Sequence, residues 1–264
     1  MKPQLSLQLY TIREEYESDP AAALDRIAAQ GFERVEVIHF TGRAAEIRSA
    51  LDAAGLAAPS GHSMFLTDEL RFGGRVITVP PLAQILDDAE ELGIELLIDP
   101  MTAADRWLDA DGIARIAERM NACAAEAAKR GIRVGFHNHA HEFASSFGGV
   151  SAYETLVAQL DPIVTVELDA YWAKVGGQDA PALADRLGDR LVALHVKDGR
   201  LPPVPDPGRP PAQVPAGTGD VGLSEVLERA RALELAIVEY DHVDGDVFDA
   251  IAASARFLAG RGIR

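Results

Sequence analysis

The sequence of 264 residues contains a single cysteine, Cys123, so an internal disulfide is excluded. Cys123 lies in a stretch of helical period, IAERMNACAAEAAKRG, where a small side chain on an apolar helix face is the ordinary role and a catalytic thiol the exception. A metal site built from several thiolates is excluded for the same reason. The fold must therefore be held by its apolar core, and 48% of the residues are hydrophobic.

Long apolar segments and basic clusters are also lacking. No apolar run approaches the roughly 20 residues that a transmembrane helix needs, and the N-terminal segment MKPQLSLQLYTIREEY is too polar for a signal peptide. We therefore expect a cytoplasmic protein without a membrane partner. The formal net charge is −16, and such a surface repels phosphate backbones, so we expect no nucleic-acid partner.

The pattern that is present is an alternation of short β-branched segments with longer segments of helical period. Strands are predicted at 5–10, 34–40, 57–63, 94–100, 132–139, 163–172, 191–198 and 235–242. Helices are predicted near 18–31, 44–54, 81–92, 111–130, 151–160, 180–188, 223–233 and 246–260.

This alternation predicts an α/β protein with a parallel sheet covered by helices. Eight units in about 250 residues are typical of a closed (β/α)₈ TIM barrel, so residues 1–264 are predicted to form a single domain. A doubly wound open sheet is the alternative, and it is disfavoured because no glycine-rich phosphate-binding turn follows the first strand. Barrels of this kind often pair as homodimers, although no apolar surface stripe marks an interface in the sequence.

One segment departs from the alternation, at about 200–220 after the seventh strand. Its prolines, in LPPVPDPGRPPAQVPAGTGD, are incompatible with regular structure. We interpret it either as a loop that covers the mouth of the barrel or as a surface insertion.

The histidines and acids gather where the predicted strands end. The carboxyl ends of the strands line the active-site mouth of such a barrel. Six of the seven histidines lie within a few residues of a strand's carboxyl end, and His242 follows the eighth strand as closely. These positions include His39, His62, His137, His139, His141 and His195, with Glu36, Asp99, Glu142, Glu167, Asp169, Glu239 and Asp241 as the acids.

Strands flanked by helices are apolar, and burying a carboxylate in one is energetically costly. An acidic residue in such a strand therefore indicates a function. Asp169 and Glu239 stand in such strands, and His195 lies on the strand between them. Carboxylates and an imidazole on adjacent strands predict a site for one divalent ion, with Mn²⁺ as the first choice and Mg²⁺, Co²⁺ or Zn²⁺ as alternatives. Taken singly, Asp169 is also compatible with a loop cap, His195 with a hydrogen-bonded rim residue and Glu239 with an ion pair to Lys197.

The motifs SLQLYTIR, GFERVEV, GFHNHAHEF, ELDAYWAKVGG, HVKD and GTGDVG resemble, in order and over nearly the whole chain, the xylose-isomerase-like TIM barrel superfamily. The likeness is to its sugar phosphate isomerase/epimerase branch. The resemblance implies a metal held by one residue after each of the last four strands, which here are Glu142, Asp169, His195 and Glu239. His137 stands where many relatives have their glutamate, and we expect it to contact substrate or a ligand while Glu142 binds the metal.

The resemblance implies an isomerase or epimerase that acts on a small carbohydrate, a sugar or keto-polyol, through an enediolate. Glu239 and Glu142 are the expected acid–base pair, and Lys197 would neutralise the developing oxyanion. The expected substrate-binding residues are His39, His62, His137, His139 and Trp172.

Two other functions use the same residues. The same enolate can expel a leaving group, which would make the protein a dehydratase or a lyase for a keto-sugar or 3-keto-glycoside. A degenerate barrel that binds sugars without turnover is the non-enzymatic alternative. DNA repair endonucleases of the superfamily need a basic groove, which is absent here. Beyond Lys197 and Arg200 no basic cluster follows strands seven and eight, so an unphosphorylated substrate is favoured.

Overall fold

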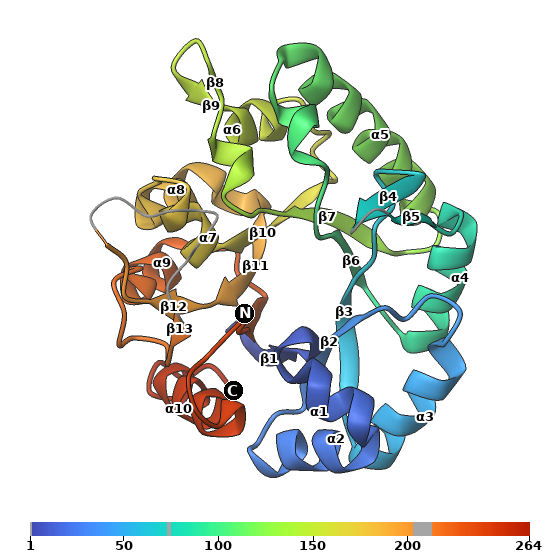
Figure 1. Cartoon of the computed structure of the whole chain (residues 1–264), viewed down its shortest axis with the longest axis vertical. Helices are drawn as coiled ribbons and strands as arrows, with labels where there is room; N and C mark the ends of the chain where they lie inside the picture. Colours follow the sequence, from blue (N-terminus) through green and yellow to red (C-terminus); the bar gives the residue numbers. More distant parts are fainter. Residues whose placement is uncertain (1, 73–74, 203–212) are drawn as a thin grey trace.

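The eight predicted strands form a closed parallel barrel in the computed structural model, which describes residues 2–72, 75–202 and 213–264 (Figure 1). The barrel strands are β1 (Gln4–Gln8), β2 (Arg34–Ile38), β3 (Ala57–His62), β6 (Leu96–Asp99), β7 (Arg133–His137), β10 (Thr165–Asp169), β11 (Leu191–Val196) and β14 (Leu235–Val238). They are arranged in the order β1-β14-β11-β10-β7-β6-β3-β2, and the last returns to the first. The TIM barrel prediction is confirmed.

A helix follows each barrel strand, and Figure 1 shows these helices as a ring around the barrel. They are α2 (Pro20–Ala29), α3 (Ala44–Ala54), α4 (Leu82–Leu92), α5 (Ala110–Ala128), α6 (Ala152–Val157), α8 (Ala180–Leu187), α9 (Leu223–Arg229) and α10 (Val247–Ala259). The short helices α1 (Arg13–Ser18) and α7 (Ala170–Val175) and the 3₁₀ turns η1 (Leu9–Ile12), η2 (Ala104–Trp107), η3 (His141–Phe143) and η4 (Gly188–Arg190) lie between them. None of the helices described is long and apolar enough to cross a membrane.

Local sequence signals set where the helices begin and end. The Asp19 carboxylate accepts a hydrogen bond from the Ala22 amide, and Pro20 occupies the first turn of α2. Gly55 ends α3 with φ 69°, a left-handed conformation that glycine adopts without strain.

The barrel interior changes from apolar to polar along its axis. A small apolar cluster fills one part of it, with Leu96, Ile98, Val192, Ala193, Leu235 and Ile237 all buried. Side chains two residues apart on a strand share a face, so Ala193 is followed on the same face by His195, and Ile237 by Glu239. The functional residues therefore lie above this apolar floor, at the carboxyl ends of the strands.

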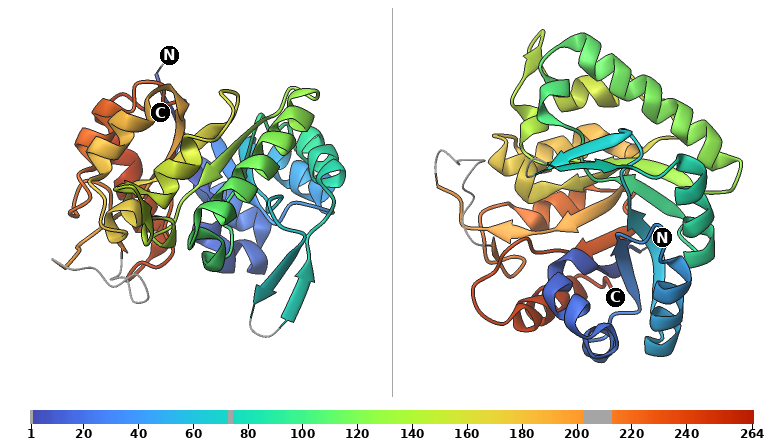
Figure 2. Two further views of the ribbon diagram at one scale, coloured as in Figure 1. Left: turned by 90° about the horizontal axis from the view of Figure 1, so that it is seen from above. Right: turned by 45° about the vertical axis from the view of Figure 1, so that its right-hand side comes forward.

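Three two-stranded antiparallel sheets extend the loops at this end, and the sequence analysis predicts none of them. They pair β4 (Glu69–Phe72) with β5 (Arg75–Thr78), β8 (Ser146–Phe147) with β9 (Val150–Ser151), and β12 (Asp198–Gly199) with β13 (Gln213–Val214). The β4–β5 hairpin projects from the end of the barrel opposite the two termini (Figure 2, left). Its sequence signal is Gly-Gly at 73–74 between apolar-rich segments, a common hairpin pattern.

The proline-rich segment predicted at about 200–220 is described only at its two ends, since 203–212 lie outside the described residues. Its far end is anchored by Asp198, whose buried carboxylate accepts hydrogen bonds from the amides of Gly199, Gly217, Gly219 and Val221. The segment therefore returns to the mouth of the barrel next to β11.

Candidate metal and substrate site

A cavity of about 490 Å³ opens at the carboxyl ends of the strands. Its lining includes Glu239 and four of the histidines expected to bind substrate or metal: His39, His62, His137 and His139. Gln8, Tyr10 and Asp241 also line it. The cavity lies where barrels of this type hold their substrates, and its volume falls within the roughly 300–1,000 Å³ typical of ligand pockets.

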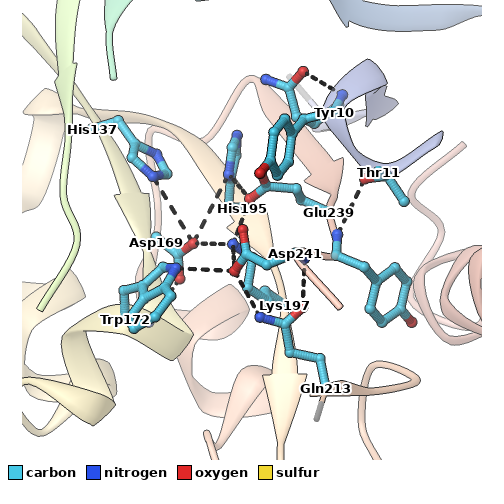
Figure 3. Close-up of polar contacts among 12 residues, drawn as sticks. Tyr10, Thr11, His137, Asp169, Trp172, His195, Lys197, Gln213, Glu239 and Asp241 are labelled. Carbon is cyan, nitrogen blue, oxygen red and sulfur yellow. Dashed lines mark hydrogen bonds and ion pairs between the residues drawn. The ribbon is translucent and has the colours of Figure 1, made fainter. Parts of the chain in front are cut away.

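A cluster of charged side chains lies at this mouth, and we call Asp169, His195, Lys197, Glu239 and Asp241 the rim cluster (Figure 3). Lys197 Nζ lies 2.6 Å from Glu239 Oε2, 2.9 Å from Asp241 Oδ2 and 3.0 Å from Asp169 Oδ2. Burial opposes the charge of Lys197, but the three carboxylates raise the pKa of its ammonium well above the usual value. One ammonium thus serves three carboxylates, which leaves two negative charges in excess before His195, whose contacts also reach deeper carboxylates, is counted.

His195 connects the rim cluster to groups deeper in the barrel. Its Nδ1 lies 2.6 Å from Glu239 Oε2 and 4.0 Å from Asp169 Oδ2. Although burial favours the neutral ring, Glu167 and Glu239 raise the pKa of His195 well above its usual value. A metal ion at this position would replace the proton that Nδ1 shares with the carboxylate, as metal binding to histidine generally requires.

The donor set of the rim fits a divalent ion. Asp169, His195 and Glu239 each offer one ligand atom, and these atoms all lie within 4.8 Å of one another. Asp169 Oδ2 is fully buried and accepts no hydrogen bond, and its nearest cationic neighbour, Lys197 Nζ, lies 3.0 Å away as an ion-pair partner that Glu239 and Asp241 share. Burial raises the pKa of Asp169 to about 6. A dication would satisfy this oxygen and balance the excess charge.

His137, at the end of β7, points into the same space (Figure 3). Its Nε2 lies 4.0 Å from Asp169 Oδ2, and its Nδ1 lies 2.9 Å from Glu167 Oε1. Burial, with the charge of His195, lowers the pKa of His137 well below its usual value. A neutral His137 ring that donates a hydrogen bond from Nδ1 to Glu167 keeps a lone pair on Nε2, and this lone pair faces Asp169. Histidines that bind metals commonly donate their other ring N–H to a carboxylate in the same way.

Glu142, the expected fifth-strand ligand, lies in η3 beside the cavity residues rather than among them. Its Oε2 accepts a hydrogen bond of 2.9 Å from the His139 amide, and its Oε1 lies 3.1 Å from His141 Nε2. It is in neither group of potential metal ligands among the described residues. Burial raises the pKa of Glu142 to about 8. Its roles as ligand and as acid–base partner stay predictions.

A second set of polar residues lies deeper, and we call Gln8, Glu36, His62 and Glu167 the inner layer. Glu36 Oε1 accepts from Gln8 Nε2 at 2.7 Å and lies 3.0 Å from His62 Nε2 and 2.9 Å from His195 Nε2. Glu167 Oε1 lies 2.7 Å from His62 Nε2 and 3.1 Å from His195 Nε2. These contacts fix the orientation of the two imidazole rings.

The charges of the inner layer balance. Burial opposes ionisation of both carboxyls, yet the imidazoles of His62 and His195 hold the pKa values of Glu36 and Glu167 well below the usual range. Burial likewise opposes protonation of His62, but Glu36 and Glu167 raise its pKa to about 10. His62 lines the cavity, but its Nε2 is committed to these two carboxylates.

Asp241 and Gln213 complete the rim, and the sequence analysis assigned a role to neither. Asp241 Oδ2 accepts from Trp172 Nε1 at 3.1 Å and from Gln213 Nε2 at 2.8 Å, while Gln213 Oε1 accepts from the Asp241 amide at 2.7 Å. The sequence could have identified Asp241 as a site residue, because it follows Glu239 by two positions and so lies on the same face of the predicted strand. Gln213 follows the proline-rich segment, and no sequence pattern marks it as a site residue. Trp172 contacts the rim cluster, and its expected role in substrate binding stays a prediction.

The sequence and the fold are similar to those of known proteins. Residues 24–260 match the family described as Xylose isomerase-like TIM barrel. A curated relative, 2-epi-5-epi-valiolone 7-phosphate 2-epimerase of Actinoplanes sp., is 27% identical over 244 residues, covering 85% of this chain and 84% of the relative.

Two solved structures show the same fold. A sugar phosphate isomerase/epimerase from Parabacteroides distasonis superposes with a TM-score of 0.78 at 22% identity, over 98% of this chain and 94% of the other. A probable 3-DHS dehydratase from Bacillus anthracis superposes with a TM-score of 0.69 at 13% identity, over 98% of this chain and 99% of the other. The match to the family covers most of the sequence, and the closed barrel agrees with it. The chain therefore belongs to the xylose isomerase-like TIM barrel family.

Proposed function

We propose that the protein is a divalent-metal-dependent isomerase or epimerase of a sugar or keto-polyol, which acts through an enediolate of the substrate. The observation that carries the proposal is the rim cluster, where Asp169 Oδ2 is buried without a donor beside His195 Nδ1 and Glu239 Oε2. The epimerase activity named for the Actinoplanes relative, at 27% identity, is consistent with this chemistry.

Asp169, His195 and Glu239 would hold the metal, with His137 or Glu142 as the fourth protein ligand. A bound divalent ion would act as a Lewis acid that acidifies the C–H next to the substrate carbonyl. Mn²⁺ suits this mixed carboxylate and imidazole set, as do Mg²⁺, Co²⁺ and Zn²⁺.

The chain's own residues would move the proton. Glu239 lines the cavity, and its contacts with Lys197 and His195 outweigh burial and lower its pKa well below the usual value, so it is an ionised carboxylate. It is our candidate for the base. On the other side of the reacting carbon the candidates are Glu142 and Asp241, of which Asp241 lines the cavity.

The remaining residues would hold and orient the substrate. Lys197 carries a positive charge at the rim that stabilises an oxyanion as it forms. His39 and His139 line the cavity and offer ring nitrogens to hydroxyl groups, while the indole of Trp172 lies with its ring centroid 5.7 Å from that of His139. His39 has φ 48°, and it is the one non-glycine residue with positive φ among the described residues. Such strain is often kept at functional sites.

The metal is the first point to test. We expect elemental mass spectrometry to find about one equivalent of Mn²⁺ after the protein has been stripped with chelator and reloaded, and Asp169→Asn to lose most of it. Glu118→Gln, on the exposed face of α5, is the matched control and should bind as wild type does. Equal Mn²⁺ in Asp169→Asn, or none in the wild type, would contradict the proposal.

The chemistry is tested on the loaded protein with a panel of keto-sugars in D₂O. We expect the substrate to take up deuterium at the carbon next to the carbonyl. Apart from this exchange, the mass of the substrate should not change. Loss of water or of a glycosidic group would instead identify a dehydratase or a lyase. A protein that binds Mn²⁺ yet exchanges no deuterium with any keto-sugar would be a sugar-binding barrel.

A further inference from the structure

The cavity has two unlike walls. One contains Gln8, His137, His139, Glu239 and Asp241 and carries the polar chemistry. The other, which we call the apolar wall, is mainly apolar: it includes Ile38, Met64, Ile77, Val79, Pro80 and Met101, with the polar His39, Thr41, Ser63 and Thr78 beside them. These residues come from the ends of β2, β3 and β6 and from the β4–β5 hairpin. In the closed strand order β3 lies between β2 and β6, away from β10, β11 and β14, which carry the rim cluster.

The apolar wall is accessible rather than packed away. Ile77 is 51% exposed, and Ile38, Met64, Val79 and Met101 are only partly buried. A sugar presents mostly hydroxyl groups, which gain little from such a surface. Apolar side chains that remain accessible inside a cavity are the usual sign of an apolar group in the ligand. The two methionines can adapt to groups of different shape.

Among the described residues, no cationic lysine or arginine side chain lines this cavity to bind a phosphate group. Lys197 is held by three carboxylates, and the Arg13 guanidinium stacks 4.3 Å from the Tyr10 ring centroid and donates to the carbonyls of Tyr10 and Asp241. Proteins bind phosphate through free Arg, Lys or backbone N–H donors, whereas a phosphate here would meet Glu239 and Asp241.

We propose that the substrate is an unphosphorylated keto-sugar or keto-polyol that carries an apolar substituent, with its carbonyl at the rim cluster and its substituent against the apolar wall. This rests on the proposed function and narrows the substrate class. The β4–β5 hairpin then determines which substituents are accepted. The substituent contributes more to the differences in affinity between substrates than the sugar does.

The test compares three probes on Mn²⁺-loaded protein: methyl 3-keto-β-D-glucopyranoside, its phenyl analogue and 3-ketoglucose 6-phosphate. The KM for deuterium uptake or elimination is measured by mass spectrometry. We expect the phenyl compound to have a KM about tenfold lower than the methyl compound, because it buries more apolar surface. The phosphate should be the poorest of the three.

Two neighbouring residues of the hairpin give matched variants. Ile77 lines the cavity, whereas Val76, the residue before it, does not and is 53% exposed. Ile77→Ser should raise the KM of the phenyl compound about threefold and leave that of the methyl compound unchanged. Val76→Ser should change neither.

Equal KM values for phenyl and methyl compounds, a preference for the phosphate, or equal effects of Ile77→Ser and Val76→Ser would each overturn the substrate class while leaving the proposed reaction intact. Mn²⁺-loaded protein that converts none of the three probes, nor any other keto-sugar, would overturn the reaction and the substrate class together.

Discussion

The rim cluster and the inner layer both contain buried carboxylates, and His195 of the rim contacts both sets, yet the two regions hold charge differently. In the inner layer two carboxylates, Glu36 and Glu167, face the imidazoles of His62 and His195. In the rim cluster three carboxylates face the single ammonium of Lys197. The inner layer is balanced without a further ion, whereas the rim is balanced only if it binds one.

Access to the cavity distinguishes individual carboxylates. Glu239 and Asp241 of the rim line the cavity, whereas Asp169, Glu36 and Glu167 are fully buried and do not; Gln8 and His62 of the inner layer also line it. The second oxygens of Glu36 and Glu167 also lack hydrogen-bond donors, so the contrast lies in charge and access rather than in hydrogen bonding alone. Four inner atoms, from His62, His137, Glu167 and His195, also cluster closely enough for a metal. We favour the rim, because the rim has both the excess charge and a path to substrate.

Glu239→Gln is expected to have the largest effect, because it removes a ligand and the proposed base together. We expect turnover of a keto-sugar to fall by about 10³-fold or more. The free energy of unfolding should fall less than in a variant of the inner layer, since Lys197 keeps Asp169 and Asp241 as partners. Kinetics and urea unfolding of the same preparation measure both. Full turnover in Glu239→Gln with metal bound would exclude this residue as the base.

Glu167→Gln should lower the free energy of unfolding more than Glu239→Gln does. Removing one charge of a buried, paired network leaves Glu36 as the one inner carboxylate that His62 and His195 share, and breaking such a network costs about 3–5 kcal/mol. Urea unfolding of the metal-free proteins should therefore place Glu167→Gln well below Glu239→Gln. If the two variants were equally stable, the distinction between the inner layer and the rim would fail.

The sequence predicts the barrel and part of the rim, for an identifiable reason. Strand alternation places Asp169, His195 and Glu239 on faces that adjacent strands bring together, and in the structure their ligand atoms do lie together. The inner layer joins Glu36 to His195, 159 positions apart and on strands β2 and β11, which are not neighbours in the barrel. Alternation shows which face a residue is on, but it does not show which residue it meets across the barrel.

The placement of Glu142 and the hairpin depends on loop conformation, which the periodicity of the sequence does not specify. Five residues beyond His137, Glu142 can fold toward the metal or away from it, and here it contacts the His139 amide and His141. The β4–β5 hairpin carries Ile77, and its only signals were the Gly-Gly pair and the apolar residues beside it. In our proposal the loops therefore supply the residues that determine specificity, while the strands supply those that the pattern could identify.

His62→Gln tests the charge balance of the inner layer through the pH dependence of stability. The native protein holds a proton on His62 up to about pH 10, whereas the unfolded chain releases it near 6.5. The stability that this proton contributes is therefore fully present below pH 6.5 and is lost as the pH rises toward 10. In urea unfolding of metal-free protein, the stability advantage of wild type over His62→Gln should shrink from pH 6 to pH 9.5, by about 4 kcal/mol, since one pKa unit corresponds to about 1.4 kcal/mol. An advantage that grows with pH would mean that the ring is neutral in the native state, and the inner layer would then carry uncompensated negative charge as the rim cluster does.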